Sequence, residues 1–213
     1  MTIGHKIIPV TSFSQNCSLI WCEQTKQAAL VDPGGEIERL LAEVDTLGLE
    51  LVAALATHGH VDHVAGIAEL KHIRPIKVYG PHQADRFLLE SLSELAARFG
   101  FPQKTCESFV PDVWLADGDT VKIGNISLAV KHIAGHTPGH VVYYYAEGNL
   151  LLGGDVLFYH SVGRTDLQMG SREDLINNIK TKLLTLPEET TVVPGHGPTT
   201  TIGHEKLENP FLK

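Results

Sequence analysis

The first quarter of the chain alternates short apolar runs with turn-forming residues, a pattern that predicts β-strands. A turn signal, Asp32–Gly35 (DPGG), follows the third run. Apolar residues then recur with the period of an α-helix from Glu36 to Leu47, and Gly48 is typical of a helix end. The apolar run Leu51–Ala56 predicts a strand that is buried on both faces. The strands predicted before the turn are Lys6–Val10, Cys17–Trp21 and Ala28–Val31.

The rest of the chain continues this alternation of helical and extended patterns. The predicted helices are His63–Ile73, Ala84–Phe99 and Asp174–Leu186. The predicted strands are Ile76–Tyr79, Thr120–Ile123, Ile126–His132, Val141–Tyr145, Leu150–Leu152 and Thr191–Val193. A strand followed by a helix and another strand predicts a crossover connection and a sheet that helices cover. Two such halves predict a sandwich of two sheets with helices on the outside.

Length and composition are those of an ordinary globular protein. A chain of 213 residues with 43% hydrophobic residues can bury one substantial core, and we expect a single domain over residues 1–213. The formal net charge of −8 leaves no basic surplus for a nucleic-acid partner. The longest apolar runs are too short to span a bilayer, so we expect no membrane partner. The oligomeric state does not follow from the sequence.

The cysteines and the first residues bear on the cellular compartment. Cys17, Cys22 and Cys106 are an odd number without a disulfide framework, which predicts reduced thiols. The first ten residues, MTIGHKIIPV, contain neither the basic segment nor the long apolar segment of a secretory signal. We therefore expect a cytoplasmic protein.

The strongest chemical signal is the segment Thr57–His63 (THGHVDH), which directly follows a predicted strand. Imidazoles and carboxylates at this spacing are typical of zinc or iron sites, and they suit manganese less well. Alternate side chains of an extended chain share a face, so we expect His58, His60 and Asp62 to converge on one side of the chain. His63 breaks the alternation, so we expect it to point elsewhere, which would suit a second metal beside the first.

One loop cannot complete the ligand shells of two metals, so further ligands must come from loops at the ends of later strands. Three candidates follow predicted strands and lie beside glycine, where the backbone can turn tightly: His136 in AGHTPGH, Asp155 in LLGGD and His196 in VVPGHGP. The sequence therefore predicts a two-metal site. Its seven predicted ligands are His58, His60, Asp62, His63, His136, Asp155 and His196.

The order of these motifs resembles the metallo-β-lactamase superfamily, from H-x-H-x-D-H through G-H-T-x-G-H and the later aspartate to P-G-H-G. The segments QNCSLIW, VDPGG, VGRTD, PGHGP and ENPFL are similar to the short, single-domain bacterial branch of the hydroxyacylglutathione hydrolases (glyoxalase II). The resemblance runs over nearly the whole chain. It implies an α/β fold, the four-layer αββα sandwich, without the C-terminal helical domain of full-length glyoxalase II.

The resemblance also implies how the ligands are shared between two divalent metal ions, zinc first, with iron or manganese as alternatives. The first ion takes His58, His60 and His136. The second ion takes Asp62, His63 and His196, and Asp155 bridges both. Asp62 is also the implied catalytic residue, because it would orient the attacking water and take its proton. His140, in the same loop as His136, is assigned a structural role behind the ligands.

The implied activity is hydrolysis of a small-molecule thioester, S-D-lactoylglutathione, to D-lactate and glutathione. Only 17 residues follow His196, and they contain few basic side chains, so the glutathione site must differ from that of full-length glyoxalase II. The segment before VGR reads FYHS, where the similar branch has small residues. We expect Arg164 to bind an acidic group of the substrate or to brace its loop through Asp166.

Other functions remain open on these residues. A persulfide dioxygenase resembles the first metal site but holds one iron with two histidines and one aspartate. Another hydrolase of the same fold would act on a lactone or a phosphodiester. The β-lactamase subclass that the chain best resembles has cysteine at the position of Asp155, and an RNA-processing nuclease would need a basic surface. A zinc-stabilised binding module would need closed sites with four ligands each.

Overall fold

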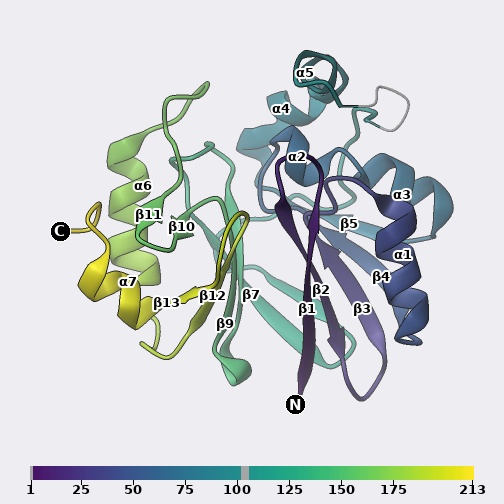
Figure 1. Cartoon of the computed structure of the whole chain (residues 1–213), viewed down its shortest axis with the longest axis horizontal. Helices are drawn as coiled ribbons and strands as arrows, with labels where there is room; N and C mark the ends of the chain where they lie inside the picture. The colour runs from purple at the N-terminus through teal and green to yellow at the C-terminus, as the bar shows by residue number, and fades with distance from the viewer. Residues whose placement is uncertain (1, 102–105) are drawn as a thin grey trace.

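The computed structural model describes residues 2–101 and 106–213, and it confirms the predicted αββα sandwich. Two β-sheets face each other, and helices cover the outer face of each (Figure 1). The helices outside the first sheet are α1 (Ile37–Thr46) and α3 (Ile67–Ile73). Those outside the second sheet are α6 (Arg172–Asn178) and α7 (Ile202–Glu208).

The first sheet comes from the N-terminal part of the chain and has the strand order β1-β2-β3-β4-β5. Its strands are β1 (Ile3–Val10), β2 (Gln15–Cys22), β3 (Gln27–Val31), β4 (Glu50–Leu55) and β5 (Lys77–Tyr79). The pairs β3–β4 and β4–β5 are parallel, since α1 and then α2 and α3 cross between them as predicted. The carboxyl ends of β3 and β4 therefore lie at the same edge of the sheet.

The second sheet has the strand order β13-β12-β9-β8-β7-β6. Its strands are β6 (Thr120–Ile123), β7 (Ile126–His132), β8 (Val141–Tyr145), β9 (Leu150–Gly154), β12 (Thr191–Pro194) and β13 (Thr200–Thr201). A small hairpin joins β10 (Leu157–Phe158) to β11 (Ser161–Val162), and a 3-10 turn, η2 (Ala146–Gly148), joins β8 to β9. Because β9 and β12 are parallel neighbours, the residues that follow them also meet at one edge.

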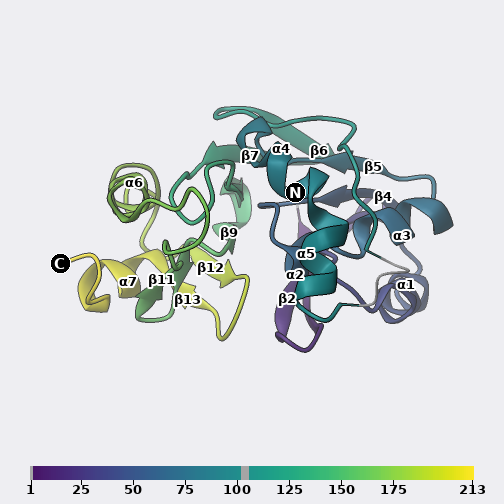
Figure 2. The same cartoon turned by 90° about the horizontal axis from the view of Figure 1, so that it is seen from above.

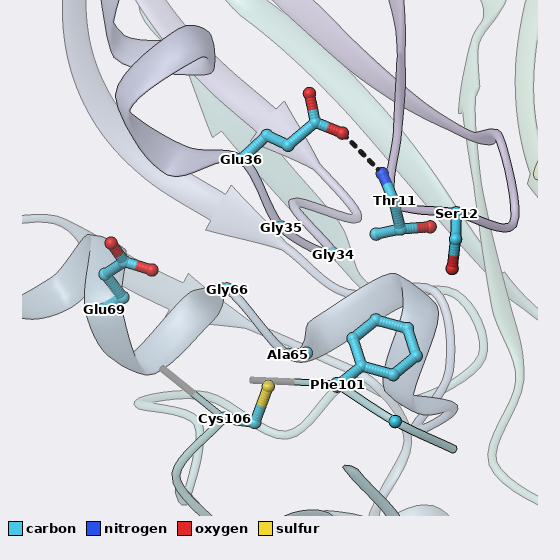
Figure 3. A pocket seen from close by; sticks show the side chains of 11 residues that line it. Thr11, Ser12, Gly34, Gly35, Glu36, Ala65, Gly66, Glu69, Phe101 and Cys106 are labelled. Atoms are coloured by element: carbon cyan, nitrogen blue, oxygen red, sulfur yellow. Dashed lines mark hydrogen bonds between the residues drawn. The ribbon is translucent and has the colours of Figure 1, made fainter. Parts of the chain in front are cut away.

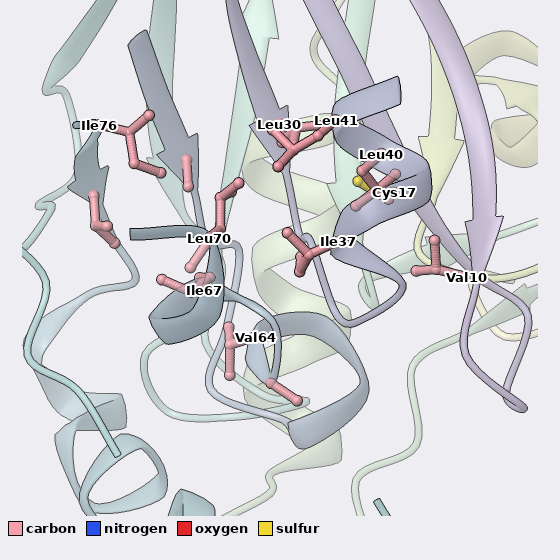
Figure 4. Packing of buried hydrophobic residues seen from close by; sticks show 14 of the residues in the cluster. Val10, Cys17, Leu30, Ile37, Leu40, Leu41, Val64, Ile67, Leu70 and Ile76 are labelled. Carbon is pink, nitrogen blue, oxygen red and sulfur yellow. The ribbon is translucent and has the colours of Figure 1, made fainter. Parts of the chain in front are cut away.

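Three apolar clusters hold these layers together. One lies between the first sheet and its helices, where Ile37, Leu40 and Leu70 pack toward the strands (Figure 4). A second fills the space between the two sheets, and a third lies under α6 and α7. Tyr143 in the middle cluster is fully buried, and its hydroxyl donates to the carbonyl oxygen of Ala56 at 2.7 Å. This bond joins the second sheet to the loop that carries the histidine motif.

Two predicted helices are interrupted. The prediction His63–Ile73 corresponds to α2 (Val61–Val64) and α3, which are separated by a turn at Gly66. The prediction Ala84–Phe99 corresponds to η1 (Gln83–Asp85), α4 (Arg86–Glu90) and α5 (Leu92–Arg98). The break lies at Ser91, whose hydroxyl donates to the carbonyl oxygen of Phe87 at 2.8 Å and so competes with the helical backbone. As a result α5 packs near α2 (Figure 2).

The remaining differences concern the C-terminal part. The predicted helix Asp174–Leu186 is α6 followed by a π-helical segment, η3 (Ile179–Leu183). The short strands β10, β11 and β13 and the helix α7 were not predicted, because their runs are too short to show a period. The prediction that the strand at Leu51–Ala56 is buried on both faces is wrong for Leu51 and Val52, which are partly exposed. Among the described residues, no helix has the length and apolar character needed to cross a membrane.

Candidate metal centre

The seven predicted ligands lie together at one edge of the sandwich, in loops or a short helix that follow strands. Four of them follow β4: His58 and His60 in the loop, then Asp62 and His63 in α2. Three follow strands of the second sheet: His136 after β7, Asp155 after β9 and His196 after β12. Both halves of the chain therefore supply side chains to the same place.

His58, His60 and His136 each direct one nitrogen toward a common point. Nε2 of His58 lies 3.0 Å from Nδ1 of His60, which lies 2.9 Å from Nε2 of His136. The ligand nitrogens around a tetrahedral zinc ion, with bonds of about 2.0–2.1 Å, are about 3.3 Å apart. The three side chains, which we call the first group, thus have the spacing that one metal ion requires.

Hydrogen bonds determine which nitrogens of the first group carry protons. Thr57 Oγ1 donates to a carboxylate behind the site at 2.7 Å, so it accepts from Nδ1 of His58 at 3.0 Å. The carbonyl oxygen of Arg164 accepts from Nδ1 of His136 at 2.8 Å. Nε2 of both rings therefore presents a lone pair, and Nδ1 of His60 can donate to only one of them. A cation at the common point would satisfy all three nitrogens, so the donor set fits a metal ion.

A second group combines Asp62, His63 and His196. Oδ2 of Asp62 lies 3.1 Å from Nε2 of His196 and 3.7 Å from Nε2 of His63. The expectation that Asp62 shares a face with His58 and His60 is wrong, because the extended chain ends at His60 and α2 begins directly after it. Both groups nevertheless have the composition that the family resemblance implies.

Asp155 lies between the two groups. Its Oδ1 is 3.4 Å from Nε2 of His63, and its Oδ2 is 3.5 Å from Nε2 of His136 and 3.8 Å from Nε2 of His196. Oδ1 of Asp155 and Nε2 of His63 are buried, and neither has a hydrogen-bond partner among the described residues. Buried polar atoms without partners are costly, so their position here fits cations bound between the groups.

A carboxylate that the motif analysis did not single out lies behind both groups. Asp32 follows β3, and because β3 and β4 are parallel it meets Thr57 at the same sheet edge. Its Oδ2 accepts from Nδ1 of His63 at 2.8 Å and from Oγ1 of Thr57 at 2.7 Å, and its Oδ1 accepts from the backbone N of Thr57 at 2.7 Å. Asp32, His58 and His63 lie close enough to surround an ion, but these bonds already occupy their facing atoms. Asp32 therefore orients one ligand of each group.

A second carboxylate joins two of the ligand loops. Asp85 in η1 is fully buried and accepts hydrogen bonds from the backbone N of Gly59 at 2.9 Å, the backbone N of Gly139 at 2.5 Å and Oγ1 of Thr137 at 2.8 Å. A Cβ at Gly59 would lie 2.7 Å from Cβ of Leu88, so any larger residue would displace this loop. The loop before α2 and the loop after β7 are thus held in fixed positions.

His140 contacts the first group without joining it. Its ring stacks on that of His58, with 4.6 Å between the ring centroids. Its Nε2 accepts from the backbone N of Asp155 at 3.0 Å. These contacts support the structural role assigned to His140, because they place two ligands and leave its ring outside both groups.

The two groups differ in their affinity for protons. Burial and the neighbouring imidazoles lower the pKa of His58 well below its usual range and lower the pKa of His60 to about 3. Although burial opposes a charge on His63, nearby carboxylates, Asp155 first among them, raise the pKa of His63 well above its usual value. Burial also opposes a charge on His196, but a hydrogen bond to a carboxylate raises its pKa. The first group keeps neutral imidazoles, whereas the second group binds protons when no metal is present.

A pocket of about 580 Å³ leads to both groups. Five of the seven predicted ligands line this pocket: His60, Asp62, His136, Asp155 and His196. Its walls include apolar residues from the β1–β2 turn and from the segment of α4 and α5, namely Phe13, Leu88, Leu95 and Phe99, and also Val61 and Leu167. Two arginines, Arg98 and Arg164, also line this pocket.

Arg164 lies in the pocket, where a substrate-binding residue is expected, but its guanidinium is already paired. Its Nε and Nη2 donate to the two carboxylate oxygens of Asp166, each at 2.8 Å. A role of Arg164 in substrate binding stays a prediction. Arg98, at the end of α5, was not singled out by the sequence, because no motif surrounds it.

A smaller pocket of about 210 Å³ lies beside the turn at Gly34 and Gly35 (Figure 3). Figure 3 shows Glu36 turned toward Thr11, whose backbone N donates to Oε1 of Glu36 at 2.8 Å. None of the seven predicted ligands lines this pocket, so it is separate from the metal groups.

The sequence is similar to a known protein family, to curated relatives and to solved structures. The sequence matches the metallo-beta-lactamase superfamily over residues 10–196. A curated relative, hydroxyacylglutathione hydrolase GloC of Haemophilus influenzae, is 46% identical over 208 residues, which cover 97% of each chain.

Two solved structures are similar over nearly the whole chain. BLEG-1 B3 metallo-beta-lactamase has a TM-score of 0.89 and 37% identity, covering 98% of this chain and 99% of that one. TTHA1623, solved in a di-iron-bound form, has a TM-score of 0.87 and 38% identity, covering 97% of this chain and 100% of that one.

Proposed function

The chain belongs to the metallo-β-lactamase superfamily and is a metal-dependent hydrolase, and we propose that it hydrolyses hydroxyacylglutathione thioesters. The proposed reaction converts S-D-lactoylglutathione and water to D-lactate and glutathione. The observation that carries this proposal is the pair of metal-binding groups lining an open pocket, in a chain 46% identical to hydroxyacylglutathione hydrolase GloC along 97% of its length.

We propose two divalent metal ions per chain, with zinc in both groups. Imidazole and carboxylate donors suit zinc and iron, and the similar TTHA1623 was solved with two irons. His58, His60 and His136 would hold the first ion, Asp62, His63 and His196 would hold the second, and Asp155 would contact both. When bound, such ions lower the pKa of a coordinated water to about 7 and polarise a carbonyl oxygen.

The protein side chains would orient the reacting groups. Asp62 belongs to the second group and also lines the pocket, so its carboxylate is placed to orient the attacking water and accept its proton. The leaving thiol has an ordinary pKa near 8.5, so it departs as a thiolate without an acid beside it. No hydroxyl, thiol or amine side chain occurs among the described residues that line the pocket, which supports water as the nucleophile.

Three other activities share parts of this site. A persulfide dioxygenase would need only one iron, and the second group argues against it because its three donors are already assembled. The similarity to BLEG-1 makes β-lactam hydrolysis an activity to be measured. A binding module would close its metal sites, whereas here a pocket opens onto both groups.

The proposed function is tested by counting metals and measuring turnover on the same preparation. We expect close to two metal ions per chain and rapid release of glutathione from S-D-lactoylglutathione. Oxygen consumption with glutathione persulfide by protein that holds one iron would favour the dioxygenase. Cleavage of a β-lactam, a lactone or a phosphodiester without thioester hydrolysis would contradict the proposed substrate. The assignment of the fold and of the metal-binding groups would be unaffected.

Acidification is expected to remove metal in two steps. His63 and His196 have raised pKa values, so protons compete with metal at the second group at a higher pH than they do at the first group. His58 and His60 have lowered pKa values and stay neutral far below pH 6, so the first group loses its metal only in stronger acid. Metal content after equilibrium dialysis across a pH series measures both steps.

The variant His196→Ala provides the control for that titration, because it should show only the more acidic step. A single transition in the wild-type protein, with both metals lost together, would contradict the assignment of different proton affinities to the two groups.

We further propose that the protein works on small molecules in the cytoplasm. Cys17 and Cys22 are buried and form no disulfide, as expected where thiols stay reduced. The net charge of −8 argues against a nucleic-acid partner.

A further inference from the structure

Two arginines are among the described residues that line the large pocket, and only one of these two carries an unpaired charge. The guanidinium of Arg164 forms two hydrogen bonds with the carboxylate of Asp166, so this exposed pair carries no net charge. No carboxylate partner of Arg98 exists among residues 2–101 and 106–213. Of the two arginines, Arg98 is therefore the one whose charge is available to a ligand in the pocket.

The backbone of Arg98 is held in place relative to the metal groups. The helix α5 is anchored by Leu92 and Ala96, which are fully buried. Just beyond the helix the ring of Phe101 stacks on Phe13, with 5.6 Å between the ring centroids. The carbonyl oxygen of Phe13 accepts from Nδ1 of His196 at 3.1 Å. The end of α5 is thus joined to a predicted metal ligand through two contacts.

The surroundings of Arg98 favour an elongated ligand with an anionic end. Phe13, Leu95 and Phe99 line the same pocket as Arg98 and the predicted metal ligands, so a ligand that reaches both the metal groups and Arg98 meets apolar surface in this pocket. An arginine beside apolar surface competes less with water for a carboxylate than an arginine surrounded by polar groups does, and its fork of donors matches the two carboxylate oxygens. A thioester held with its carbonyl at the metals would extend its thiol half along this wall.

We infer that Arg98 binds a carboxylate of the thiol half of the substrate and so selects anionic thiols over neutral ones. This inference rests on the proposed thioester hydrolysis. The charge of the substrate would then be recognised by Arg98 at the end of α5. Arg164 would stabilise its own loop, and the carbonyl oxygen of Arg164 accepts a hydrogen bond from Nδ1 of His136. The substrate class that follows is an acyl thioester of a thiol that bears a carboxylate some distance from the sulfur.

The test compares Arg98→Met with the wild-type enzyme on two thioesters of the same D-lactoyl group. One is the glutathione thioester and the other is the neutral N-acetylcysteamine thioester. We expect Arg98→Met to raise KM about fivefold to tenfold for the glutathione thioester, to leave kcat nearly unchanged, and to leave both constants unchanged for the neutral thioester. The wild-type KM for the glutathione thioester should rise with salt, and this rise should disappear in Arg98→Met.

Three further variants separate charge recognition from general effects. Arg98→Lys keeps the charge and should recover part of the loss. Arg86→Met removes an arginine of α4 that pairs with Glu90 at 2.7 Å and does not line the pocket, so it should behave as wild type. Arg164→Met should affect the two thioesters equally, because that guanidinium is already paired.

Binding gives a second measurement that needs no turnover. S-hexylglutathione is a thioether that the enzyme cannot hydrolyse, and its Kd should rise in Arg98→Met by the same factor as KM. An equal change for both thioesters, or no change for either, would overturn the role of Arg98. Wild-type enzyme that cleaves neither thioester would instead reject the proposed function, and S-hexylglutathione binding would still decide whether Arg98 recognises the carboxylate.

Discussion

Replacing Asp155 with alanine is expected to release most of the bound metal and to lower kcat/KM at least about a thousandfold. The carboxylate lies within 3.4–3.8 Å of a nitrogen of His63, His136 and His196, so its loss weakens both groups at once. The three imidazoles also lose the negative charge that offsets two cations. Metal per chain after dialysis and the rate of thioester hydrolysis measure the two effects.

The matched control is Asp174→Ala, which removes an exposed carboxylate at the start of α6. We expect this variant to keep wild-type metal content and activity. Circular dichroism and the melting temperature in excess metal show whether Asp155→Ala retains its fold. A folded Asp155→Ala protein with two metals and near wild-type turnover would show that the carboxylate does not bridge the groups.

Asp32→Asn is expected to reduce metal affinity about 10- to 100-fold without removing a ligand. Three donors point at the two oxygens of Asp32: the backbone N and Oγ1 of Thr57, and Nδ1 of His63. An amide offers one acceptor oxygen, so one or more of these donors would face an NH₂ group. We expect a loss of roughly 1–3 kcal/mol in the free energy of unfolding of the metal-free protein.

The choice of asparagine separates side-chain chemistry from backbone strain. Asp32 has φ 53°, and asparagine tolerates this left-handed conformation as well as aspartate does. Asp45→Asn is the control, because Asp45 is exposed and its carboxylate pairs with Arg74. Unchanged metal affinity in Asp32→Asn, measured by competition with a chelator, would mean that His63 and His58 keep their orientation without the carboxylate.

The seven predicted ligands could be found in the sequence and lie together in the structure because their motifs are local and strands alternate with helices along the chain. His58 to His63 are close in the chain, and the order of strands and helices brings the ends of β7, β9 and β12 to the same edge. The sandwich itself follows from apolar runs of strand length between amphipathic helices. The wrong expectation for Asp62 arose at the boundary between loop and helix, where the period changes from two residues to 3.6.

Three residues near the site were not identified from the sequence, because their roles depend on contacts between distant parts of the chain. Asp32 stands in a turn signal, and its role depends on the parallel pairing of β3 with β4. Asp85 meets Gly139 only because α4 begins beside the loop after β7. Arg98 lines the pocket and has no carboxylate partner among the described residues. No sequence pattern shows whether an arginine is paired in the folded protein.

Loops of both sheets supply ligands to each metal group, so metal uptake depends on the folding of both halves of the chain. An ion bound by His60 and His136 closes a loop of more than seventy residues, much as a disulfide would. The histidine motif is synthesised long before His196, so the early part of the chain holds only a fraction of each ligand set. We therefore expect the nascent chain to acquire tightly bound metal only after the two sheets have docked. Chelators should accordingly lower the melting temperature of the folded protein.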